Sequence, residues 1–177
     1  MDKSSDELHW RETYFILFPQ DCRPTIQQVQ KALAAANARY QIKNPAADET
    51  GLLLSVFVES AEDHAAVEIS YEVGDAVIEQ NLTWAKELQS QIPAEKLQQM
   101  MIADARLDLA HYERVPSANA DSPVDTAAFG GEFDDEFGAE EDVFDMLDPT
   151  CLLTVVDTLA ELTGGLTIDP ASGEILN

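Results

Sequence analysis

The stretch TYFILF, Thr13–Phe18, is the first firm structural signal in a chain of 177 residues. Apolar side chains occupy its odd and even positions alike, which is typical of a strand buried on both faces in the middle of a sheet. A turn over 19–24 ends this strand. Thr25 and Gln28 then form a capping box, which predicts an amphipathic helix over 25–41.

A β-hairpin is predicted after this helix. LLLSVFVE, 52–59, and AVEISYEV, 66–73, are the two strands, and the second alternates apolar with polar positions as a strand with one buried face does. From 74 onward apolar positions recur at helical spacing, and Pro93 at a first-turn position restarts the helix. A last strand over 107–115 completes this part of the chain.

The order strand, helix, strand, strand, helix, strand over 11–116 resembles the ferredoxin-like split βαβ fold (βαββαβ), which implies an α+β protein with an antiparallel sheet. A further helix over 149–163 and a small hairpin follow, and their sequence LTGGLTIDPASGEIL resembles the ending of uncharacterised bacterial domains. We expect a single domain with four parts: a disordered N-terminus over 1–10, the α+β core over 11–116, an acidic Phe-containing flexible insert over 117–147, and the C-terminal helix and hairpin over 148–177 packed on the core.

A ferredoxin-like sheet has both helices on one face and leaves the other face open. Apolar side chains such as Leu53 and Phe57 are expected on that open face, together with those of the central strand. We expect the helix over 149–163 and its hairpin to cover this face. A homodimer through the sheet face is the competing arrangement.

Charge excludes one class of partner. Ten Lys and Arg against 34 Asp and Glu give a formal net charge of −24 at pH 7, so the phosphates of a nucleic acid would be repelled. No run is long and apolar enough to cross a membrane, and Cys22 and Cys151 form no C-x-x-C pair, which is typical of a reducing compartment. We expect a cytoplasmic protein that binds neither nucleic acid nor membrane.

The acidic insert has the clearest functional pattern. Four phenylalanines are placed among carboxylates: Phe129, Phe133, Phe137 and Phe144, with Asp134, Asp135, Glu136, Glu140, Glu141 and Asp142. A fully solvated spacer has no use for four aromatic side chains. Either they fold back onto the domain, or they anchor the insert on a protein partner with a basic surface while the carboxylates steer the encounter.

Two residues are candidates for chemistry. Cys151 lies near the start of a helix, where the dipole favours a thiolate, but the neighbouring Asp148 raises a thiol pKa and the apolar context favours a buried structural role. His111 shares a strand face with Leu107 and Leu109. A histidine in that position is more often structural than catalytic.

No metal or cofactor is predicted. An EF-hand pattern around Gly138 fails because Phe133 and Phe137 stand at ligand positions. Phosphate-binding glycine motifs and G-x-S-x-G are absent, and carboxylates such as Glu68 and Glu72 are expected to be solvated charge. The two tryptophans and two adjacent methionines are predicted to pack in the core: Trp10, Trp84, Met100 and Met101.

These patterns favour a noncatalytic, acidic interaction or regulatory protein that binds a protein partner through charge and Phe anchors. The second hypothesis is a small-ligand sensing domain with a pocket between the sheet and the C-terminal helix. The third is an enzyme that uses Cys151 or His111.

Overall fold

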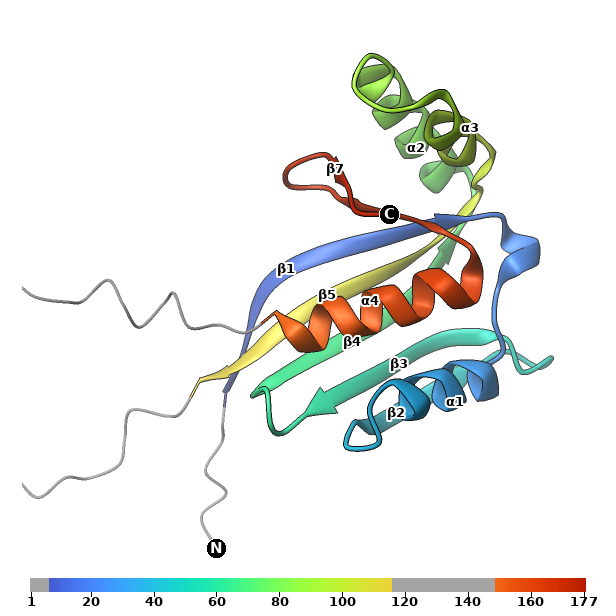
Figure 1. Ribbon diagram of the computed structural model, residues 1–177. Helices are drawn as coiled ribbons and strands as arrows, with labels where there is room; N and C mark the ends of the chain where they lie inside the picture. Colours follow the sequence, from blue (N-terminus) through green and yellow to red (C-terminus); the bar gives the residue numbers. More distant parts are fainter. Residues whose placement is uncertain (1–6, 116–148) are drawn as a thin grey trace, which may run out of the picture.

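The computed structural model describes residues 7–115 and 149–177. Over these residues the chain is an α+β protein in which four helices accompany one open, seven-stranded antiparallel sheet (Figure 1). The strands are β1 (Glu7–Phe18), β2 (Gln41–Ala47), β3 (Leu53–Ser60), β4 (Ala65–Val73), β5 (Ala105–Val115), β6 (Leu166–Asp169) and β7 (Glu174–Ile175). The helices are α1 (Ile26–Ala36), α2 (Asp75–Leu88), α3 (Ala94–Ile102) and α4 (Thr150–Thr163), with a short 3₁₀ turn over Gln20–Cys22.

The C-terminal part of strand β1 is buried on both faces, as the TYFILF pattern predicts, whereas the first four residues of the strand are exposed. Ile16 and Phe18 belong to one apolar core, beneath α1 and α4. Leu17 belongs to a second core, together with Trp84 of α2 and Met100 of α3. Because successive side chains of a strand point to opposite faces, one six-residue stretch supplies both cores.

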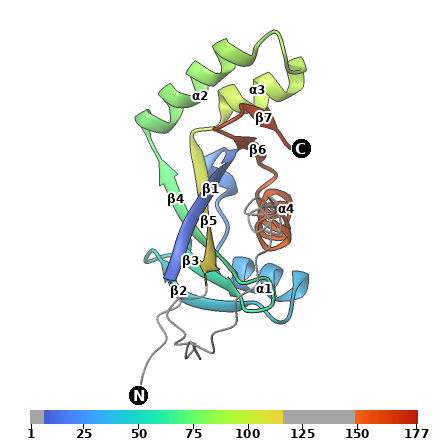
Figure 2. The ribbon, with the colours of Figure 1, turned by 90° about the vertical axis from the view of Figure 1, so that its left-hand side faces the viewer.

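Helices α1 and α4 cover the same face of the sheet. Val29 and Leu33 of α1 lie in one core cluster with Leu152, Val155 and Leu159 of α4, and all five are fully buried. The prediction that the helix over 149–163 lies on the face opposite the first helix is therefore wrong. The opposite face of β1 is already occupied at one end by the α2–α3 pair, so α4 packs beside α1 (Figure 2).

The close approach of α4 to β1 depends on two glycines. Gly164 ends α4 in the left-handed region with φ 64°, where glycine carries no steric penalty. A Cβ on Gly165 would lie 2.5 Å from Cγ2 of Ile16 and 2.9 Å from the carbonyl oxygen of Leu17. The absence of a side chain there lets the chain enter β6, which pairs with β1.

The strand order β2-β3-β4-β5-β1-β6-β7 does not confirm the ferredoxin-like topology. A ferredoxin-like sheet places the first strand beside the second hairpin strand, which is β4. Here β5 lies between β4 and β1 and pairs with both along most of its length. The β3–β4 hairpin, the break between α2 and α3, and the closing β6–β7 hairpin are confirmed.

Several boundaries differ from the sequence-based expectation. Strand β1 begins at Glu7, within the part expected to be a disordered N-terminus, because β5 extends far enough to pair with it. Helix α1 has the predicted capping box but ends at Ala36 instead of 41. The chain then forms the edge strand β2, which contains Pro45 and was not predicted; proline is tolerated there because an edge strand leaves one row of N–H groups unpaired.

The predicted core residues divide into two groups. Trp84 and Met100 are buried as predicted, whereas Trp10 and Met101 are exposed by 60% and 53%. Leu53, expected on the open face, is fully buried beneath the helices, because the β-bulge between β2 and β3 changes which positions of β3 face the core.

Candidate functional site

The Phe-containing acidic segment, which holds the predicted partner-binding residues, lies outside the described residues. Its two attachment points are described: Val115, the last residue of β5, and Pro149, directly before α4. Figure 1 shows that β5 ends and α4 begins on the side of the domain away from α2 and α3. Both β5 and α4 contribute side chains to the same apolar core.

Cys151 is a buried structural thiol. Its side chain belongs to the core beneath α1 and α4. Burial and the nearby Asp63 carboxylate raise the pKa of Cys151 to about 11, although a hydrogen bond with Tyr40 acts in the opposite direction. The thiol is therefore protonated at neutral pH, and a reactive thiolate is not formed in the native fold.

His111 occupies the predicted strand face with Leu107 and Leu109 and is 2% exposed. Its Nδ1 lies 3.3 Å from Oε1 of Glu12 on β1. Its Nε2 is buried and has no hydrogen-bond partner among the described residues. A general base must reach the proton it abstracts, and this ring has almost no exposed surface through which a substrate could approach.

Residues 7–115 and 149–177 contain neither a metal-binding cluster nor a membrane-spanning helix. Within these ranges no three His, Cys, Asp or Glu side chains are grouped so that they could hold a metal ion. None of the four described helices is long and apolar enough to cross a membrane.

Most basic side chains in the described residues are already paired with acids of the domain. Six of the nine Lys and Arg side chains make ion pairs: Arg11 with Glu113, Arg23 with Asp48, Arg39 with Glu62, Lys43 and Arg114 with Glu59, and Arg106 with Asp108. The Glu59 carboxylate is nearly buried, and its hydrogen bond from Lys43 and the charge of Arg114 lower its pKa. Most basic side chains of the described domain are thus neutralised by its own acids.

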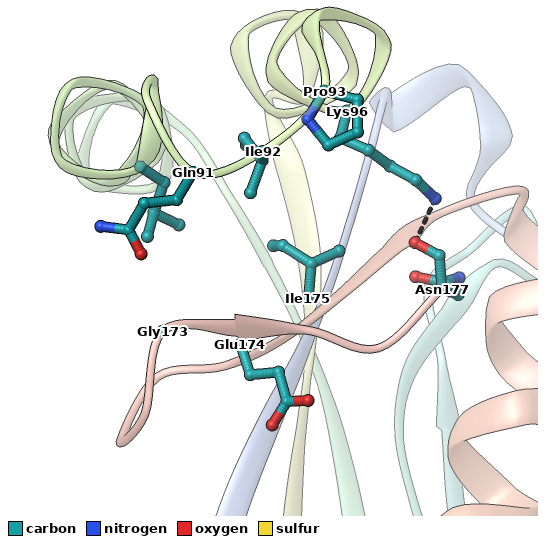
Figure 3. A pocket seen from close by; sticks show the side chains of 9 residues that line it. Gln91, Ile92, Pro93, Lys96, Gly173, Glu174, Ile175 and Asn177 are labelled. Atoms are coloured by element: carbon teal, nitrogen blue, oxygen red, sulfur yellow. Dashed lines mark hydrogen bonds between the residues drawn. The ribbon is translucent and has the colours of Figure 1, made fainter.

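A shallow pocket of about 330 Å³ lies between the α2–α3 connection and the C-terminal hairpin (Figure 3). The apolar side chains of Ile92 and Ile175 face each other across it, and Lys96 reaches over to donate a hydrogen bond to the backbone oxygen of Asn177. This pocket is not the one predicted between the sheet and the C-terminal helix. At that predicted position the side chains of α4 pack directly onto β1 and β4.

The face of the sheet opposite α1 and α4 is free of described helices beyond the end occupied by α2 and α3 (Figure 2). Strand register places Trp10, Tyr112 and Glu68 on this face. Sequence patterns did not bring these residues together, because they come from three strands whose order is set by tertiary pairing.

Comparison with known proteins gives no relative: no protein-family model, no curated protein and no solved structure matches this chain. Evidence on the function therefore comes from the charges, the ion pairs and the surfaces of the protein itself.

Proposed function

We propose that this protein is a noncatalytic interaction or regulatory protein that binds a partner with a basic surface through the acidic segment over 117–147. The phenylalanines of the segment serve as apolar anchors, and its carboxylates steer the encounter. Between Val115 and Pro149 the chain has eleven Asp and Glu, four Phe and no Lys or Arg. A segment of this composition attracts cationic surfaces over a distance of about the Debye length.

The observation that carries this proposal is that most Lys and Arg side chains of the described domain already form ion pairs within it. With six of nine described basic side chains already ion-paired, the acids of the segment have few uncommitted cations in the domain to neutralise them. The net charge of −24 therefore favours a cation-bearing partner over self-association.

The test uses the full chain and two variants. One replaces Phe129, Phe133, Phe137 and Phe144 with Ser; the other replaces the six acids between 134 and 142 with their amides. We expect the wild type to capture a partner at about 50 mM salt and release most of it at about 500 mM, because exposed charges are screened. The Phe variant should lose the partner at both salt concentrations, and the amide variant should lose the salt dependence.

Two outcomes contradict the proposal. One is the absence of any salt-sensitive partner, and the other is unchanged capture by the Phe variant. Deleting residues 118–145 gives a further check, because a large loss of thermal stability would show that the phenylalanines pack on their own domain.

A second candidate function is the sensing of a small ligand, favoured by the pocket of Figure 3. A ligand bound there would bridge the α2–α3 connection and the C-terminal hairpin and raise the melting temperature. A thermal-shift screen with metabolites tests this: a stabilising compound should lose its effect in Lys96→Ala, and a screen without any stabilising compound counts against the idea.

A further inference from the structure

The open face of the sheet carries an aromatic and acidic patch made of Trp10, Phe57, Glu68 and Tyr112. Trp10 on β1 lies opposite Tyr112 on β5, and Glu68 on β4 lies opposite Phe57 on β3. Phe57 and Glu68 point away from α1 and α4, because Val56, Val58, Val67 and Ile69, which alternate with them, lie in the core beneath those helices. Tyr112 is on the same side of β5 as Ala110, which lies opposite Glu68, and Trp10 lies opposite Tyr112. We refer to these four residues as the Trp10 patch.

Two hydrogen bonds orient the polar groups of the patch. The indole Nε1 of Trp10 donates to Oγ1 of Thr13 at 3.0 Å, while 60% of the residue stays exposed. The hydroxyl of Tyr112 donates to Oε2 of Glu68 at 3.3 Å. Burial, and the Glu68 carboxylate, raise the pKa of Tyr112, so this hydroxyl remains a donor at neutral pH.

Small residues separate the members of the patch. Ala66 stands next to Glu68 along the same side of β4, and Ala110 lies directly opposite Glu68 on β5. Because alanine side chains are short, the exposed Glu68 carboxylate and the rings of Phe57 and Tyr112 rise above the floor of the sheet. The result is a carboxylate with aromatic side chains on either side.

Glu68 has no ion-pair partner among the described residues. The cations of this face have other partners: Lys43 and Arg114 pair with Glu59. Arg106 pairs with Asp108 and stacks 4.3 Å above the Phe15 ring. The charge of Glu68 is therefore available to a group from outside the described domain.

We infer that the Trp10 patch receives a Lys or Arg side chain of the protein partner. A carboxylate flanked by aromatic faces is the arrangement that binds an organic cation, by ion pairing and by cation–π contact. This inference rests on the proposed function for the basic character of the partner. A second copy of the chain fits less well, because it would bring a net charge of −24, and six of its nine described basic side chains are already ion-paired.

The experiment follows the two tryptophan indole N–H signals of the ¹⁵N-labelled full chain while an octalysine peptide is added. Trp84 is 9% exposed and serves as the internal reference. We expect a saturable shift of the Trp10 signal and none of Trp84. Glu68→Gln should weaken the binding that moves Trp10 by about three- to tenfold. Glu72→Gln is the matched control, since Glu72 is an exposed carboxylate on the same strand and face, and it should leave that binding unchanged.

The outcomes separate this inference from the proposed function. A Trp10 signal that does not move while the peptide binds, or an equal effect of the two Gln variants, overturns the inference and leaves the acidic segment as the binding element. A Trp10 response that persists in the chain with the four Phe→Ser replacements supports the patch as an independent cation site. Partner capture unchanged by those replacements overturns the proposed function alone.

Discussion

The two cysteines allow a direct test of whether the protein has a reactive thiol. Cys151 is fully buried and Cys22 is exposed, so a single alkylation experiment contains its own control. The perturbation is iodoacetamide at pH 7.5 on the native chain, and the Cys22→Ser variant isolates the behaviour of Cys151. A reactive Cys151 would support the hypothesis that the protein is an enzyme that uses this thiol.

The size of the expected effect follows from the pKa of the Cys151 thiol. Burial and the Asp63 carboxylate raise that pKa to about 11. At pH 7.5 roughly 0.03% of such a thiol is thiolate, against about 10% for an ordinary cysteine with a pKa of about 8.5. Ionisation alone therefore slows alkylation by about 300-fold. Burial slows it further, because the reagent reaches the sulfur only when the core opens.

Intact-mass spectrometry over several hours reads out the result. The native wild type should gain one adduct, on Cys22, and the native Cys22→Ser variant should gain none. In about 6 M guanidinium both proteins should gain an adduct on Cys151, which shows that the sulfur is chemically intact. Alkylation of the native Cys22→Ser variant at a rate within tenfold of that of Cys22 would refute the structural assignment.

Two further predictions concern stability. Glu59→Gln should lower the free energy of unfolding by about 1–3 kcal/mol at pH 7, because Glu59 accepts a hydrogen bond from Lys43 while nearly buried. That hydrogen bond lowers the pKa of Glu59 below its ordinary value of 4.5, so its contribution is present above that pH and is lost as the pH falls through the folded-state pKa. Urea unfolding at pH 7 and pH 4 checks this, and an equal loss between the two pH values in wild type and variant would contradict it. Gly165→Ala should lower the free energy of unfolding by about 1–3 kcal/mol or more, because the added Cβ would lie 2.5 Å from the Ile16 side chain. Gly164→Ala is the comparison variant, because a Cβ there meets open space while the backbone has φ 64°; backbone strain should lower its free energy of unfolding by about 1–2 kcal/mol. Thermal melts in which the Gly165 variant is the more stable of the two would exclude the steric explanation.

Sequence patterns predicted helices and strands correctly where a local motif is compatible with a single local structure. Thr25 and Gln28 define the start of α1, and both hydrogen bonds of the capping box are present. Alternation over 66–73 predicted a strand with one buried face, and Val67 and Ile69 of β4 lie in the core, with Tyr71 partly buried against it and Val73 exposed at the end of the strand. Strand β2 was missed because QIKNPAA has neither alternation nor a β-branched run beyond one isoleucine; its extended form depends on pairing with β3.

The candidate site was predicted only in part. The acidic segment with its phenylalanines is visible in the sequence because composition alone reveals it. The Trp10 patch is not, since Trp10, Glu68 and Tyr112 lie on three strands, and their neighbourhood depends on β5 pairing with both β1 and β4. Trp10 was assigned to packing because a large aromatic residue is usually buried, yet α2 and α3 occupy only the other end of its sheet face and leave it exposed.

The TYFILF stretch illustrates which features the sequence determined and which features only the tertiary structure decided. Apolar side chains at both odd and even positions from Tyr14 to Phe18 determined that this part of β1 would be buried on both faces, because side chains of a strand alternate and each face must then meet an apolar partner. The sequence also determined the acidic excess and its concentration between β5 and α4. Only the tertiary structure decided which partners β1 receives: α1 and α4 on one face, and α2 and α3 on the other. That choice depends on strand order and on the close passage at Gly165, which are set by contacts between residues far apart in the chain.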